Sequence, residues 1–163
     1  MPRVAIITLL FLPKTGEVKK SVVTLCLMLV SVAVLAQDWN TDLAIAKRKA
    51  AAENKTILLV FSGSDWCMPC MYLDKILWPS EEFKTAADKN WVLLRADFLQ
   101  KKGNPEPVNV NDMKMILAEK YNRDGFFPFF VMLDRNGKII KKSGYEEFDH
   151  PAEYVFLFKS MSH

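Results

Sequence analysis

Two cysteines three positions apart, Cys67 and Cys70, are the residues of this chain with the most direct chemical use. They follow a continuous apolar run over residues 56–61 and a polar stretch over residues 62–65, which predicts a buried strand, a turn and a helix that begins around the cysteines. Free N–H groups and the dipole at a helix N-terminus stabilise a thiolate, which lowers the pKa of the first cysteine from about 8.5. We therefore expect Cys67 to attack disulfides, and Cys70, one turn deeper, to resolve the mixed disulfide that forms.

Other uses of a cysteine pair fit the rest of the sequence less well. A structural zinc site usually has four ligands, whereas the chain after residue 36 holds no further cysteine and only His150 and His163. Haem attachment requires a histidine directly after the second cysteine, where this chain has Met71. A disulfide that closes so small a loop adds little stability. The pair therefore predicts a redox-active disulfide, with no metal and no other cofactor.

The elements that must position the cysteines follow from the spacing of apolar residues. Their order predicts one α/β domain with a central mixed sheet of about four strands flanked by helices. Ser64 or Asp65 is expected to cap the helix at the cysteines, and Asn136 with Gly137 indicates a tight turn between the last two strands. The predicted ranges are helices over 42–54, from the cysteines to Pro79, from Ser80 onward, 111–121 and 151–161, strands over 56–61, 91–97, 126–133 and 138–143, and a polar loop over 98–108.

The residues around the cysteines resemble the W-C-x-P-C active site of thioredoxins. The matching run is Trp66, Cys67, Met68, Pro69 and Cys70. Residues 120–128 are similar to the family's segment that leads into its cis-proline, and residues 129–140 resemble the hairpin that follows. Because the resemblance covers nearly all of residues 37–163, it implies a single thioredoxin-like domain over that range.

The resemblance also implies which residues meet a substrate. It implies a cis peptide bond between Phe127 and Pro128 that faces the cysteines, and pairing of the Phe127 backbone with an incoming substrate strand. Cis bonds are rare enough to make this a specific prediction. The substrate-binding residues expected on this basis are Trp66, Met68, Pro69, Phe127 and Pro128.

The chain departs from the family pattern in three places. Phe61 stands where thioredoxins commonly carry a buried acidic residue that helps the second cysteine lose its proton. The proton of Cys70 must therefore go elsewhere. Phe129 follows the proline where a threonine is usual, and the loop over residues 98–108 makes the chain longer than a minimal thioredoxin. The last two departures indicate a different set of partners.

The front of the chain has the layout of a secretory signal peptide. Lys19 and Lys20 precede an apolar run over residues 21–36, which is short for a membrane span of about 20 residues. We predict a signal peptide over residues 1–36, with a start codon nearer residue 18 as an alternative, and a mature domain over 37–163. Cleavage removes four of 22 basic and one of 19 acidic residues. The mature chain is then formally neutral, which argues against nucleic acid as a partner and leaves the signal as the expected contact with a membrane.

Together these features predict a periplasmic or otherwise extracytoplasmic thiol–disulfide oxidoreductase. The expected partners are protein thiols and disulfides and an upstream redox donor. Pro69 directly before Cys70 favours a reductase, and an isomerase is the nearest variant. The alternative is a binding module or copper-delivery protein of the same fold that uses the cysteines as ligands, although copper-delivery relatives usually place three residues between the cysteines and add a histidine.

Overall fold

The computed structural model describes residues 38–100 and 112–163 of the chain. The predicted signal peptide and most of the loop over 98–108 lie outside the described residues. Within the two described ranges, no helix has the length and apolar character that a membrane span needs. The helices are α2 (Leu43–Glu53), α3 (Met68–Ile76), α4 (Glu81–Asn90), α5 (Met113–Tyr121) and α6 (Pro151–Met161), and the strands are β1 (Thr56–Ser62), β2 (Trp91–Asp97), β3 (Phe129–Leu133) and β4 (Ile139–Ser143).

The four strands form one mixed sheet in the order β2-β1-β3-β4. β1 pairs in parallel with β2, so that Ser62 lies opposite Asp97 at the carboxyl end of both strands. β3 runs antiparallel to β1 and to β4. Beyond β2, Asn40 forms a bridge with Leu94 and covers that edge of the sheet. The prediction of a central mixed sheet of about four strands is confirmed.

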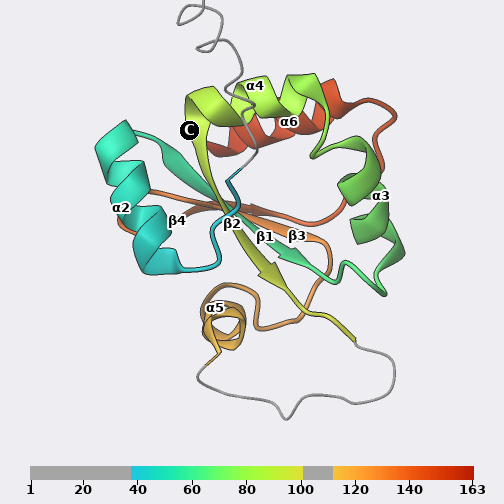
Figure 1. Ribbon diagram of the computed structural model, residues 1–163, viewed down its shortest axis with the longest axis horizontal. Helices are drawn as coiled ribbons and strands as arrows, with labels where there is room; N and C mark the ends of the chain where they lie inside the picture. Colours follow the sequence, from blue (N-terminus) through green and yellow to red (C-terminus); the bar gives the residue numbers. More distant parts are fainter. Residues whose placement is uncertain (1–37, 101–111) are drawn as a thin grey trace, which may run out of the picture. The chain divides into compact units, whose positions relative to one another are not determined.

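Helices cover both faces of the sheet (Figure 1). Alternate side chains of β1 point to opposite faces, as the pleat of a strand requires. Leu58 and Val60 join side chains of α3, α4 and α6 in one apolar cluster, here called the α6-side cluster. Ile57, Leu59 and Phe61 join side chains of α2 and α5 in a second, the α2-side cluster. This burial on both faces explains why β1 is a continuous apolar run.

Side-chain caps define where several helices begin. Asp42 accepts N–H groups of α2, Ser80 accepts the N–H of Phe83, and Asp112 accepts the N–H of Lys114. α3 ends at Ile76, before Pro79, and α4 starts directly after Ser80, as the sequence predicts.

One strand boundary differs from its predicted position by more than one residue. β3 begins at Phe129 instead of residue 126. The segment before Phe129 forms a turn in which Gly125 has a φ of 70° and the Phe127–Pro128 peptide bond is cis. Its apolar side chains therefore belong to a loop, although their pattern looks like the start of a strand.

The turn between β3 and β4 is organised by Asp134. Its carboxylate accepts the backbone N–H groups of Asn136 and Lys138, each at 2.8 Å. Hydrogen bonding from Lys138 in particular holds the pKa of Asp134 below its usual value. Gly137 adopts a φ of 82°, which L side chains rarely adopt, and its carbonyl accepts the Tyr121 hydroxyl at 2.8 Å.

Trp78 lies at the centre of the α6-side cluster. Its ring centroid is 4.8 Å from Phe83, 5.3 Å from Trp39 and 6.3 Å from Phe158. It therefore ties the corner between α3 and α4 to α6.

We expect Trp78→Ala to lower the free energy of unfolding by about 3–5 kcal/mol, because the cavity that it leaves cannot close fully. The matched control is Phe156→Ala, since Phe156 is 76% exposed and should change the value by less than about 0.5 kcal/mol. Urea unfolding followed by circular dichroism measures both. Equal effects of the two variants would contradict this view of the core.

Candidate active site

The two cysteines lie at the N-terminus of α3 and are joined by a disulfide. Their Cα atoms are 5.2 Å apart. Cys67 is itself the N-cap of the helix, and its sulfur accepts the backbone N–H of Cys70 at 3.3 Å. The predicted cap, Ser64 or Asp65, is wrong. The Cys70 N–H at the helix terminus is thus directed at the sulfur of Cys67, and such a donor stabilises negative charge on a thiolate there.

Ser64 and Asp65 instead hold the cysteine loop against the end of β2. Asp97 accepts the Ser64 N–H at 2.9 Å and the Ser64 hydroxyl at 2.6 Å. Asp65 accepts the backbone N–H of Gln100 at 2.9 Å. These long-range partners take the side chains that would otherwise cap α3, and they place Asp97 in a supporting role beside the loop.

Trp66 joins the cysteine loop to the segment before Pro128. Its indole N–H donates to the Phe98 carbonyl at 2.5 Å. Its ring meets the Phe127 ring edge-to-face, with centroids 5.3 Å apart, and Phe127 meets Phe98 at the same distance. The structure therefore brings Trp66 and Phe127, both predicted to contact substrate, into one aromatic group.

The loop that carries the cis bond is held by Asn122, which the sequence analysis did not single out. Asn122 is a buried polar residue. Its amide donates to the Phe126 carbonyl at 2.9 Å and accepts the Phe126 N–H at 3.1 Å. A side chain that satisfies both backbone groups of one residue fixes the course of the chain into Phe127 and Pro128. No short-range pattern in the sequence signals this role.

The cysteines are more covered than their neighbours. Cys67 is 5% exposed and Cys70 is 1% exposed, so the two differ less than their expected roles suggest. By contrast, Met68 is 73% exposed and Phe126 is 56% exposed. Phe126 was missed by the sequence analysis, because its apolar pattern was assigned to a strand. Exposed apolar side chains next to a largely covered disulfide suit contact with a protein surface better than with a small solute.

Phe61, which stands where thioredoxins commonly carry a buried acidic residue, has apolar surroundings. Phe61 is completely buried within the α2-side cluster, and its ring lies 6.5 Å from that of Phe129. Phe129 also contacts Phe126, and the Lys142 ammonium lies 5.8 Å from its ring centroid. Phe61 and Phe129, two of the three departures from the family pattern, are therefore in aromatic contact with each other.

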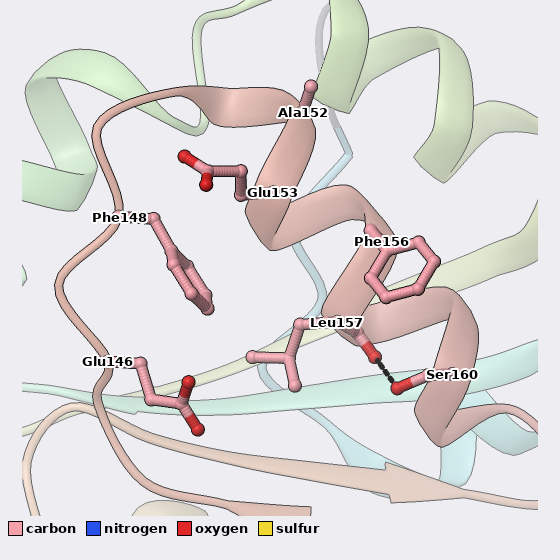
Figure 2. A pocket seen from close by; sticks show the side chains of 7 residues that line it. All are labelled: Glu146, Phe148, Ala152, Glu153, Phe156, Leu157 and Ser160. Atoms are coloured by element: carbon pink, nitrogen blue, oxygen red, sulfur yellow. Dashed lines mark hydrogen bonds between the residues drawn. The ribbon is translucent and has the colours of Figure 1, made fainter.

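A separate pocket of about 450 Å³ lies along α6 (Figure 2). Figure 2 shows Phe148 and Leu157 on its walls, with Glu146 and Glu153 at its rim. None of its lining residues is among the predicted site residues. Nearby, the buried Tyr154 hydroxyl donates to the Glu146 carbonyl at 2.9 Å, and burial raises the pKa of Tyr154 to about 12.

Comparisons with known proteins bear on this arrangement. The family model described as thioredoxin-like matches residues 38–135. The chain belongs to this family. The disulfide bond reductase DsbH of Chlamydia pneumoniae is 33% identical over 123 residues, which cover 76% of this chain and 71% of that protein. A solved DsbH oxidoreductase structure is 31% identical with a TM-score of 0.67, and the match covers 81% of this chain and 88% of that one.

A more distant structure supports the fold alone. The solution structure of a thioredoxin from Thermus thermophilus is 16% identical, with a TM-score of 0.56 over 77% of this chain and 87% of that one. The predicted thioredoxin-like α/β fold is thus confirmed. Family, fold and the Cys67–Cys70 pair make the chain a disulfide oxidoreductase.

Gly63 leaves the space that the Trp66 indole occupies. A Cβ atom at Gly63 would lie 2.3 Å from Cε2 of Trp66, whereas a Cβ atom at Gly144 would meet nothing within 4 Å. We expect Gly63→Ala to displace the indole, to change tryptophan fluorescence and to lower the free energy of unfolding by about 1–3 kcal/mol.

Gly144→Ala is the matched control and should leave both measurements unchanged. Wild-type fluorescence and wild-type stability in Gly63→Ala would contradict the described packing of Trp66.

Proposed function

We propose that this oxidoreductase acts outside the cytoplasm as a reductase of disulfides in exported proteins. The observation that carries the proposal is the Cys67–Cys70 disulfide at the N-terminus of α3, beside exposed apolar side chains. The relative named a disulfide bond reductase supports the direction of the reaction. Pro69 directly before Cys70 favours the same direction.

In the proposed reaction the two cysteines have different tasks. The reduced Cys67 thiolate attacks one sulfur of the substrate disulfide, forms a mixed disulfide and releases the other substrate sulfur as a thiolate. Cys70 then loses its proton and attacks the Cys67 sulfur, which frees the second substrate thiolate and closes the Cys67–Cys70 disulfide. The substrate gains two electrons, and an upstream redox donor must return them to the enzyme as a pair.

The substrate-binding surface in this proposal consists of side chains around the disulfide and one backbone segment. Trp66 and Met68 flank Cys67, and Phe127 lies against Trp66. The Phe127 backbone, next to Pro128, is available to pair with an extended substrate segment. Substrates are therefore proteins whose disulfide lies in an accessible, extended stretch. The five residues assigned to this surface are Trp66, Met68, Pro69, Phe127 and Pro128.

The assignment of the cysteines is tested by two single substitutions. Cys67→Ser should abolish turnover of a disulfide-bonded protein substrate, because the attacking thiolate is lost. Cys70→Ser should attack once and then accumulate a covalent complex with the substrate, which a non-reducing gel detects. Trapping by Cys67→Ser but not by Cys70→Ser would reverse the assignment.

The same assay separates the proposed function from its alternatives. A reductase yields free substrate thiols in proportion to the donor consumed, whereas an isomerase rearranges a scrambled substrate without net reduction. A copper-binding role would leave metal-free protein without any function in this assay, and full turnover by metal-free protein supports the reductase.

The proposed location rests on the predicted signal peptide. We expect mature protein recovered from the extracytoplasmic fraction to start at Gln37, directly after Ala36. Mass spectrometry of the intact protein measures this terminus. Protein that retains residues before Ser21 would contradict cleavage.

A further inference from the structure

Turnover requires Cys70 to lose a proton in a place where thiolates are disfavoured. Cys70 is 1% exposed, and burial in apolar surroundings disfavours a thiolate. Phe61 supplies no carboxylate, and its side chain packs in the α2-side cluster, on the sheet face opposite α3. Another group must therefore accept the proton.

Asp74 lies one helical turn beyond Cys70 on the same face of α3. Residues four apart on a helix have Cβ atoms about 5–6 Å apart. Leu73 and Leu77, on this stripe, are buried in the α6-side cluster. Cys70, Leu73, Asp74 and Leu77 therefore form a stripe along the side of α3 that faces the sheet. Asp74 is the charged residue of this stripe.

Arg95 of β2 holds Asp74 in this position. Both carboxylate oxygens of Asp74 accept from Nη2 of Arg95, at 2.8 and 3.0 Å. The same nitrogen donates to the Ser62 hydroxyl at 3.0 Å, and the guanidinium lies 5.7 Å from the Trp39 ring centroid. Ser62 is buried and directly precedes Gly63, whose carbonyl accepts the Cys67 N–H at 2.9 Å. The ion pair is thus connected to the base of the cysteine loop.

The alternation of side chains along the strands places Ser62 and Arg95 on the face of the sheet that α3 covers. Ser62 points to the same face of the sheet as Leu58 and Val60, because every second residue of a strand does. For the same reason Arg95 points to the same face as Trp91 and Leu93. Leu58, Val60, Trp91 and Leu93 belong to the α6-side cluster, against which α3 packs. Ser62 and Arg95 therefore point toward α3.

Among residues 38–100 and 112–163, the other ionisable groups around the cysteine loop and α3 have partners or are exposed. Asp97 accepts from Ser64, Asp65 accepts from Gln100, Tyr154 of α6 donates to Glu146, and Tyr72 and Lys75 of α3 are exposed.

We propose that Asp74, held by Arg95, accepts the proton of Cys70 in the resolving step. This inference rests on the proposed function, in which Cys70 resolves the mixed disulfide. The proton passes from the Cys70 thiol to the Asp74 carboxylate, directly or through one water. The Cys70 thiolate then attacks Cys67, the disulfide closes, and the substrate thiolate leaves.

The position of Asp74 allows it to accept a proton from Cys70 and later to release that proton to solvent. Each carboxylate oxygen keeps a lone pair beyond the one that Arg95 uses, so the ion pair leaves room for a proton. The Asp74 side chain is 29% exposed, which lets the proton pass on to solvent before the next turnover. The acid that the family usually places on the central strand is thus replaced by one on α3.

The test separates the two chemical steps. The reduced chain is mixed in a stopped-flow instrument with excess dithiobis(nitrobenzoate), which releases one coloured thiolate when Cys67 attacks and a second when Cys70 resolves. The rate of the first release rises with reagent concentration, and the rate of the second does not. Absence of the first release from the wild type would contradict the proposed function itself, independently of Asp74.

We expect Asp74→Asn to slow the second release by about tenfold or more near neutral pH while the first is unchanged. The difference from wild type should shrink as the pH rises, because hydroxide then takes the Cys70 proton. Asp74→Glu should restore most of the rate. Asp88→Asn, which changes an exposed aspartate of α4, is the matched control and should behave as wild type.

Two results would overturn the proposal. One is a second release in Asp74→Asn with the wild-type rate and pH profile, and the other is an equal slowing of both releases at every pH, which indicates a structural role only. If Asp74→Asn does not fold, Arg95→Lys provides the second test, since it retains the charge but loses the geometry that orients Asp74. A wild-type second release in that variant would overturn the role assigned to Arg95.

Discussion

The parallel pairing of β1 with β2 brings together everything that surrounds the cysteines. Ser62 lies opposite Asp97 at the last paired position, and the Phe98 N–H donates to the Ser62 carbonyl at 2.8 Å. Beyond that point the two chains stay joined, because Asp97 takes both donors of Ser64. The cysteine loop is therefore built on the ends of two buried strands, which are rigid, and α3 starts from a defined point. Precise placement of a reactive sulfur depends on such rigid support.

Local patterns in the sequence were sufficient for the elements but not for the contacts between them. The apolar run of β1, the Ser80 cap and the turn at Gly137 are short-range signals, and each lies where it was predicted. The cap of α3 was wrong because Asp97 and Gln100, more than 30 positions away, bind Ser64 and Asp65. A propensity describes what a side chain does without competitors. Distant partners decide the outcome when they are present.

The residues of the site likewise fall into those that the sequence identifies and those that only the structure reveals. Cys67, Cys70 and Trp66 stand in a run that identifies them, and Phe127 and Pro128 follow from the resemblance to the family. Asn122 and Phe126 carry no such signal. Asn122 is identified by its two hydrogen bonds to the Phe126 backbone, and Phe126 by the exposure of its side chain. The ion pair of Asp74 with Arg95 joins a helix to a strand 21 positions later. Only the packing of α3 against the sheet shows that these charges meet.

The two edges of the sheet are protected in different ways, and this matters for the extended substrates proposed for this protein. At the β2 edge, Asn40 donates its N–H to the Leu93 carbonyl and accepts from Arg95 N–H, so the neighbouring backbone groups are already used. At the opposite edge, β4 is exposed along most of its length and carries Lys141 and Lys142, which discourage further strand pairing. An extended polypeptide therefore finds little opportunity to add a strand to the sheet. In the proposed function, strand pairing with a substrate is directed instead to the backbone at Phe127, where a brief contact serves the exchange and then ends.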